Sequence, residues 1–333
     1  MMVTFDTGYR RVLLTGAAGF IGFHLAKKLL ENNLEVIGYD SVNDYYDTRL
    51  KETRLAILAK FKSFVFIHDD LIDFDSLQQV FENYKPDIVI NLAAQAGVRY
   101  SIDHPRAYID SNIIGFFNIL ECCRHYPVSH LIFASSSSVY GNQQKVPFST
   151  DDPVDRPISL YAATKKSDEL MAYTYSHLYD IPATGLRFFT VYGPYGRPDM
   201  AYFKFANLIR AGKPIKIYNN GDMRRDFTYV DDIIEGIARL INHAPKEQQG
   251  ARYHIYNIGN NHPVRLMDFI ETLEHALGAV AEKEYLPMQP GDVYQTFADI
   301  SELEHDVGFR PQTSIKIGLQ CFADWYRDYY DWH

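Results

Sequence analysis

The sequence predicts an α/β fold in which a doubly wound parallel sheet is joined to a smaller α/β lobe toward the C-terminus. Three observations favour it. Short apolar runs alternate with helical patterns through the first half of the chain, a glycine-rich turn follows the first apolar run, and the second half is richer in Pro and Gly and less regular. The length of 333 residues also favours one large domain with a smaller partner over a single compact core.

Five apolar runs in the first half have the length and composition of buried strands. They lie at residues 12–14, 35–39, 64–67, 88–90 and 131–133. Apolar residues at helical spacing predict helices at residues 21–30, 77–84, 109–123 and 161–179. Strands that alternate with helices in this way form right-handed βαβ units, whose parallel sheet is covered by helices on both faces.

The second half predicts a separate, smaller lobe. Helices are expected at residues 201–211, 231–243 and 266–277, a short strand at 215–217, and an aromatic stretch around Trp325 and Trp332 closes the chain. We assign residues 1–185 to the first domain and residues 186–333 mainly to the second lobe. Segments around 225–260 are expected to return to the first domain, which leaves the cleft between the two lobes as the candidate site.

Composition excludes several classes of function. The formal net charge of −9 argues against a nucleic-acid or anionic-membrane partner, which would need a basic surface. No apolar run approaches the roughly 20 residues that span a bilayer, and the first residues lack the apolar core of a signal peptide. The three cysteines have neither a disulfide framework nor metal-ligand spacing, so no metal is expected and a cytoplasmic location fits.

The first strand leads into a turn with three glycines, Gly16, Gly19 and Gly22, and Phe20 and Ile21 open the next helix. Glycines at this spacing allow a tight turn, a close approach of backbone N–H groups to a pyrophosphate, and close packing of helix on strand. Taken alone, the pattern also fits an ordinary strand-to-helix turn. Its position after the first strand makes the predicted sheet a Rossmann-type, nucleotide-binding one.

The second strand ends at Asp40, where an acid would accept hydrogen bonds from the hydroxyls of an adenosine ribose. No Arg or Lys follows in Ser41, Val42 or Asn43, so NAD is favoured over NADP. Further cofactor contacts are expected from short segments that follow the next strands. These are Asp70 and Leu71 for the adenine edge, and Ala93 and Ala94 as small side chains beside the cofactor.

Tyr161 and Lys165 lie at i and i+4 of a predicted helix, on one face. A nearby ammonium stabilises a phenolate, which would let Tyr161 act as a general base. In a chain with 25 tyrosines, the pair alone also fits a solvated helix face. Ser136 follows the strand at 131–133, where ligands bind in doubly wound sheets, and its hydroxyl would share a proton with Tyr161.

Together these motifs resemble the extended short-chain dehydrogenase/reductase family. Two longer segments carry the same resemblance, residues 186–194 and 225–232. Within the family the chain is most similar to UDP-glucuronate 4-epimerases, through residues 94–101 and 196–201. The resemblance runs from about Arg11 to the last helix.

The resemblance implies an isomerase with NAD as cofactor, bound mainly by residues 1–185, and a UDP-sugar substrate, bound mainly by residues 186–333. The catalytic residues would be Ser136, Tyr161 and Lys165. The cofactor would also contact Asn43, Gln95 and Asn112, the last beneath the catalytic helix. The implied substrate contacts are Arg99, Ser136, Ser137, Ser138, Thr190, Arg197, Arg225 and Asp292.

The residues narrow the reaction. Dehydratases of this family carry an Asp–Glu pair after the catalytic hydroxyl, whereas this chain has Ser137 and Ser138, which cannot serve as a strong acid–base couple. What remains is transient oxidation at C4, turning of the 4-keto sugar about its diphosphate linkage, and reduction from the other face. Arg197 is the candidate for a C6 carboxylate, because guanidinium binds carboxylate bidentately. UDP-glucuronate and UDP-galacturonate are therefore the expected pair.

Three alternatives remain open from the sequence. The chain could be a 4-epimerase of a neutral or N-acetylated UDP-hexose or its uronate, a net oxidoreductase that releases NAD(P)H, or a catalytically silent nucleotide-binding regulator. The intact set of Ser136, Tyr161 and Lys165 argues against the last. The resemblance also implies a homodimer, packed through the helices at 109–123 and 161–179, and a place in surface polysaccharide synthesis.

Overall fold

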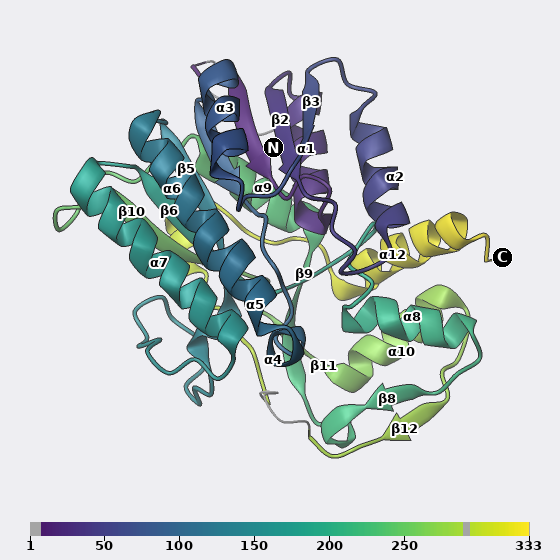
Figure 1. Cartoon of the computed structure of the whole chain (residues 1–333). Helices are drawn as coiled ribbons and strands as arrows, with labels where there is room; N and C mark the ends of the chain where they lie inside the picture. The colour runs from purple at the N-terminus through teal and green to yellow at the C-terminus, as the bar shows by residue number, and fades with distance from the viewer. Residues whose placement is uncertain (1–7, 289–293, 333) are drawn as a thin grey trace.

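The computed structural model describes residues 8–288 and 294–332. Its largest feature is a seven-stranded sheet with helices on both faces (Figure 1). The strands are β1 (Arg11–Thr15), β2 (Glu35–Asp40), β3 (Phe64–His68), β4 (Ile88–Asn91), β5 (His130–Ser136), β6 (Ala183–Phe188) and β10 (Tyr253–Ile258). They pair in parallel in the order β10-β6-β5-β4-β1-β2-β3, so the predicted doubly wound fold class is confirmed.

Two helix layers bury the faces of this sheet. One layer contains α1 (Phe20–Glu31), α2 (Thr48–Leu58) and α9 (Val230–Ile241), and the other contains α3 (Phe74–Tyr84), α6 (Gly115–His125) and α7 (Leu160–Tyr179). Successive side chains of a strand point to opposite faces. Val12 and Leu14 accordingly pack in the core with the first layer, and Leu13 packs with the second. This two-sided burial explains why the strands are almost continuously apolar.

A smaller lobe lies beside one end of the large sheet (Figure 1). Its strands form a three-stranded sheet of β7 (Thr190–Tyr192), β9 (Arg224–Tyr229) and β11 (Pro263–Arg265), and a two-stranded sheet of β8 (Ile215–Ile217) and β12 (Lys283–Tyr285). Its helices are α8 (Ala201–Arg210), α10 (Leu266–Leu277) and α12 (Ile315–Tyr330). Three short helices complete the chain: α4 (Tyr100–Asp103), α5 (Pro105–Tyr108) and α11 (Ser301–Val307).

The helix expected at residues 109–123 is broken in two. Ile109–Ile114 forms a π-helical turn, and α6 begins only at Gly115. The wider π turn inserts one extra residue into the helix and so redirects the side chains around it. It aims Asn112 inward, where its amide bonds the backbone of Gln95.

Helix α2 was not expected from the sequence. Its buried positions are Leu50, Lys51, Arg54 and Leu58, so charged residues interrupt the apolar stripe that would have marked an amphipathic helix. Asp47 caps its first turn by accepting from the Arg49 N–H. Tertiary hydrogen bonds, rather than apolar periodicity, account for this helix.

The boundary expected at residue 185 falls inside β6, a strand of the large sheet. The chain then leaves for the smaller lobe and returns through α9, which packs on α1, and β10, which pairs with β6. Strand β9 belongs instead to the three-stranded sheet. The division into two lobes stays a prediction. In the described ranges, no helix has the length and apolar character to cross a membrane.

A buried ion pair joins α7 to β6. Glu169 accepts from Arg187 through both carboxylate oxygens, at 2.8 and 3.0 Å, and also accepts from the Ser135 hydroxyl at 2.7 Å. Arg187 also donates to the Tyr140 hydroxyl at 3.0 Å. Burial by itself would raise the pKa of Glu169, but the hydrogen bonds and charge of Arg187 hold it below its ordinary value.

Removing one partner of this pair leaves the other charge buried and unpaired. We expect Arg187→Ala to lower the free energy of unfolding by about 3 kcal/mol or more, measured by urea denaturation at fixed protein and cofactor concentrations. Arg106→Ala is the matched control, since Arg106 forms an exposed pair with Asp110 and should change little. Equal effects of the two variants would show that the buried pair does not stabilise the fold.

Candidate functional site

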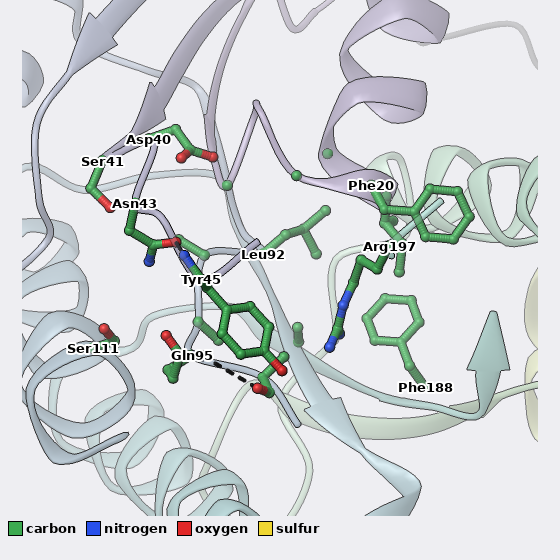
Figure 2. Close-up of a pocket in the computed structure, with 18 of the residues that line it drawn as sticks. Phe20, Asp40, Ser41, Asn43, Tyr45, Leu92, Gln95, Ser111, Phe188 and Arg197 are labelled. Carbon is green, nitrogen blue, oxygen red and sulfur yellow. Dashed lines mark hydrogen bonds between the residues drawn. The ribbon is translucent and has the colours of Figure 1, made fainter. Parts of the chain in front are cut away.

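A cavity of about 270 Å³ opens at the carboxyl ends of β1, β2, β4 and β5, next to the point where strand order reverses. Figure 2 shows side chains entering it from opposite sides, with Asp40 on one wall and Arg197 on another. Most predicted site residues line it. These are Gly16, Gly19, Phe20, Ile21, Gly22, Asp40, Asn43, Asp70, Leu71, Ala93, Ala94, Gln95, Ser136, Tyr161, Lys165 and Arg197.

The glycine loop has no room for a side chain at any of its three glycines, and the clash is most severe at Gly22. A Cβ at Gly22 would lie 2.0 Å from the Gly16 carbonyl oxygen, and one at Gly16 would lie 2.7 Å from the Ala93 nitrogen. Gly16 also has a φ of +73°, which favours glycine. The loop backbone therefore borders the cavity directly at the start of α1, where N–H groups and the helix dipole favour an anion.

Asp40 ends β2 and faces the same cavity. Its carboxylate accepts from the Ala18 N–H at 3.0 Å and from the Val42 N–H at 2.8 Å, so the backbone on both sides fixes its direction. A carboxylate held at this place suits the paired hydroxyls of a ribose. The loop and the acid together fit the pyrophosphate and ribose of a dinucleotide such as NAD.

Asn112 lies beneath the cavity wall and is buried. Its side chain accepts from the Gln95 N–H at 2.8 Å and donates to the Gln95 carbonyl at 3.1 Å and the Thr164 hydroxyl at 3.0 Å. It thus ties the segment after β4 to the first turns of α7. Asn112 acts here through its neighbours, because the cavity lining includes Gln95 and not Asn112.

Ser136, Tyr161 and Lys165 line one part of the cavity. Ser136 ends β5 and accepts from the Ser138 N–H at 3.2 Å, while Ser159 caps α7 by accepting from the Ala162 N–H at 3.1 Å. Because α7 begins just before Tyr161, one helical turn brings Lys165 onto the same face. A phenol, an ammonium and a hydroxyl meeting at one end of the sheet can exchange a proton with a ligand hydroxyl.

Asp168 is a buried carboxyl that sequence reasoning missed. The Lys165 ammonium donates to it at 3.0 Å and to the Ala134 carbonyl at 2.9 Å. Burial raises the pKa of Asp168 to about 7, against the opposing charge of Lys165. The i, i+3 spacing from Lys165 was the available signal, but such pairs usually lie on solvated helix faces.

Arg197 extends into the cavity opposite the Tyr45 ring (Figure 2). Its Nε and one Nη donate to Asp199 at 3.0 and 2.6 Å, and the Tyr45 hydroxyl donates to the same carboxylate at 3.1 Å. Burial alone would raise the pKa of Asp199, but Arg197 holds it below its ordinary value. The pair engages one edge of the guanidinium and presents the remaining N–H groups to a ligand.

Other expected substrate contacts do not line this cavity. Arg99 lies over the Tyr218 ring, 5.3 Å from its centroid, and Arg225 donates to the Tyr294 carbonyl at 3.1 Å, in the smaller lobe. Ser137 and Ser138 form a 3-10 turn behind Ser136, and Thr190 pairs with Phe227 in the three-stranded sheet. Asp292 lies outside the described residues.

Fifteen further lining residues were not assigned a role from the sequence, although some lie in segments that carry the family resemblance. They are Tyr39, Ser41, Tyr45, Tyr46, Lys51, Asp69, Leu92, Ala96, Ser111, Ala134, Ser135, Phe188, Phe189, Val191 and Met200. Most are apolar or flank a predicted residue, and their position in space marks them. In the described part of the chain, no group of three or more His, Cys, Asp or Glu side chains is placed to hold a metal ion.

The chain is similar to known proteins over nearly its whole length. The chain is 56% identical to protein CapI of Staphylococcus aureus, over 96% of this chain and 99% of that protein. It is 47% identical to a probable UDP-glucuronate 4-epimerase of Rhizobium meliloti, over 96% of this chain and 98% of that one. The crystal structure of UDP-glucuronic acid 4-epimerase from Bacillus cereus, in complex with UDP-glucuronic acid and NAD, superposes with a TM-score of 0.88. It is 34% identical and covers 96% of this chain and 100% of its own.

The model of the NAD dependent epimerase/dehydratase family matches residues 12–259, which include the glycine loop, Asp40, the catalytic candidates and β10. The match begins at β1 and ends just after the last strand of the large sheet. The predicted resemblance is thereby confirmed: the chain belongs to the NAD dependent epimerase/dehydratase family.

Proposed function

We propose that the chain interconverts UDP-glucuronate and UDP-galacturonate by inverting C4 of the sugar. The comparisons support the coarser class, an NAD-dependent isomerase that epimerises UDP-sugars. One observation carries the choice of a carboxylated sugar. A guanidinium fixed by Asp199 and Tyr45 faces the same cavity as Tyr161, Lys165 and Ser136.

The first domain holds the cofactor in this proposal. The loop from Gly16 to Gly22 takes the pyrophosphate, Asp40 takes the adenosine ribose, and Lys165 takes the nicotinamide ribose. NAD held there would supply a reversible hydride acceptor for C4 of the sugar and would not be consumed. Ala93 and Ala94 keep the wall beside it free of bulky side chains.

Tyr161 takes the proton of the 4-hydroxyl and later returns it to the 4-keto oxygen. The Lys165 ammonium stabilises the phenolate, and Ser136 hydrogen bonds the same oxygen of the sugar. Because the hydride would be transferred to and returned by one fixed cofactor, the 4-keto sugar must present its opposite face before reduction for C4 to be inverted. Ser137 and Ser138 provide no carboxyl group for elimination of water, which leaves epimerisation as the outcome.

Arg197 binds the C6 carboxylate through the edge of the guanidinium that Asp199 leaves available. This contact matters because a 4-keto sugar acid is a β-keto acid and is prone to lose CO₂. Charge-assisted hydrogen bonds to a guanidinium fix the plane of the carboxylate and favour its retention. Ser136, which lines the cavity, is proposed as a further contact of the sugar, and Arg225 and Asp292 are proposed as contacts of the nucleotide.

We expect the protein to convert UDP-glucuronate to UDP-galacturonate, followed by NMR of the sugar anomeric protons. Tyr161→Phe should abolish this conversion while NAD stays bound, because the ring remains and only the proton carrier is lost. Tyr285→Phe is the control, since Tyr285 is exposed in β12 and does not line the cavity. Turnover by Tyr161→Phe at the normal rate would refute the mechanism, and formation of a UDP-pentose would refute epimerisation.

Arg197→Met should lower kcat/KM for UDP-glucuronate by about 10- to 100-fold, the range for losing hydrogen bonds to a charged group. UDP-glucose has no carboxylate at C6 and serves as the control substrate, whose slower turnover should change little. Parallel kinetics on the two sugars measure this selectivity. Equal losses on both would contradict the carboxylate role and favour a neutral UDP-hexose as substrate.

We further propose that the protein forms a homodimer through the outer faces of the π turn, α6 and α7. Ile114, Phe117, Leu170, Tyr173 and Leu178 are exposed there although they are large and apolar. The rings of Phe117 and Tyr175 lie 6.4 Å apart, which joins the two helices into one patch. Apolar patches of this kind mark interaction sites, and a two-fold axis would cover each patch with its own copy.

Leu170→Glu should convert the dimer to a monomer, because it places a carboxylate in the centre of the patch. Sedimentation equilibrium measures the mass of the assembly. Val280→Glu is the matched control, since Val280 is more exposed than Leu170 but lies after α10 in the smaller lobe. The dimer proposal fails if wild type and Leu170→Glu have the same mass.

A further inference from the structure

The inner face of α2 carries two cations that the proposed mechanism does not use. Lys51 donates to the backbone carbonyl and side-chain oxygen of Asn43, at 2.7 and 2.8 Å. Arg54 is 0% exposed and is the largest fully buried side chain among the described residues. Burying a guanidinium is costly, and the Arg54 Nε has no hydrogen-bond partner, so the hydrogen bonds made by its two Nη atoms indicate its role.

Arg54 donates to four neutral oxygen atoms on three separate segments that border the cavity. One Nη donates to the Ala18 carbonyl at 2.8 Å and to the Tyr46 hydroxyl at 2.8 Å. The other Nη donates to the Tyr195 carbonyl at 2.6 Å and to the Gly196 carbonyl at 3.0 Å. One side chain therefore links the glycine loop, the segment after β2 and the loop that precedes Arg197.

The contact to Ala18 acts on the cofactor side of the cavity. The Ala18 N–H donates to Asp40, while its carbonyl accepts from Arg54, so the orientation of this peptide is fixed from both ends. The same peptide lies in the glycine loop, whose N–H groups border the proposed pyrophosphate site. A buried positive charge directly behind that loop also raises the potential that an anion meets there.

The contacts to Tyr195 and Gly196 act on the substrate side. Tyr195 has a φ of +52°, a left-handed conformation that non-glycine residues seldom adopt. Its ring packs 5.0 Å from Phe23 and 5.0 Å from Trp325, between α1 and α12. Because Arg54 holds both carbonyls of this strained turn, it fixes the direction in which the chain enters Arg197.

We propose that Arg54 is a positioning residue that couples the cofactor loop to Arg197, so that cofactor retention and selection of an anionic sugar depend on one guanidinium. The coupling is energetic and runs through the peptides of Ala18 and Gly196. The identity of the anionic group as a C6 carboxylate rests on the proposed function. The hydrogen bonds by which Arg54 links the two loops do not depend on the proposed function.

The experiment compares Arg54→Met and Arg54→Lys with wild type, each as the isolated full chain with its bound NAD. Arg49→Met is the matched control, because Arg49 lies on the same helix with its side chain 80% exposed. We expect Arg54→Met to release NAD about tenfold faster and to lower the kcat/KM ratio of UDP-glucuronate over UDP-glucose about tenfold. Arg54→Lys keeps the positive charge but loses the planar guanidinium with its two Nη donors, so its effects should be intermediate.

A double-mutant cycle separates positioning from general structural damage. The Arg197→Met variant already has a reduced ratio of kcat/KM for UDP-glucuronate over UDP-glucose. If Arg54 acts on selectivity through Arg197, adding Arg54→Met should leave this ratio unchanged but should still accelerate the release of NAD. A merely structural role would lower both sugar activities together and leave their ratio intact. Circular dichroism checks that each variant is folded. If Arg54→Met does not fold, Arg54→Lys provides the test instead.

Two results would overturn the proposal. One is a folded Arg54 variant whose rate of NAD release and whose kcat/KM ratio of UDP-glucuronate over UDP-glucose both equal those of wild type. The other is an additive loss of selectivity in the double variant. Failure of the proposed function would give a different result, because the wild-type protein would then not prefer UDP-glucuronate over UDP-glucose. The rate of NAD release from the Arg54 variants would still test the link between Arg54 and the cofactor loop.

Discussion

The close approach of the glycine loop to the sheet is the constraint on which the site depends. Gly22 sits against the Gly16 carbonyl so closely that any side chain there would collide with it. Helix α1 can therefore begin right after β1, with its N-terminus turned toward the cavity. Gly16 in turn lies against the backbone at Ala93, so the loop and the end of β4 share one wall. Every other element of the site is arranged around this contact.

Buried charges then position the functional groups. Lys165 is held between the Ala134 carbonyl and Asp168, Arg187 joins α7 to β6 through Glu169, and Arg54 spans three loops. Most polar atoms of these groups are hydrogen-bonded, although the Arg54 Nε and the Asp168 Oδ1 are buried without a partner.

The smaller lobe is attached to the large sheet through buried polar contacts as well as apolar packing. Asp226, fully buried in β9, accepts from the backbone N–H groups of Asn260, Asn261 and Ala298. It thereby joins β9 to the segment that follows β10 and to the segment around Ala298. Burial raises the pKa of Asp226, although these backbone hydrogen bonds oppose the rise. Asp226 thus fixes β9 relative to the segments around Asn260 and Ala298.

The sequence alone determined the doubly wound sheet, the glycine loop, Asp40 and the set of Ser136, Tyr161 and Lys165. Each of these follows from local rules: apolar runs for buried strands, glycine spacing for a tight turn, and helical periodicity for two side chains on one face. Only the tertiary structure revealed helix α2, the π turn at Asn112, Asp168 beside Lys165, and Arg54 between the two loops. Their partners lie far away along the chain, as with Arg54 and Gly196, and no local pattern encodes which distant oxygen atoms a buried cation will meet.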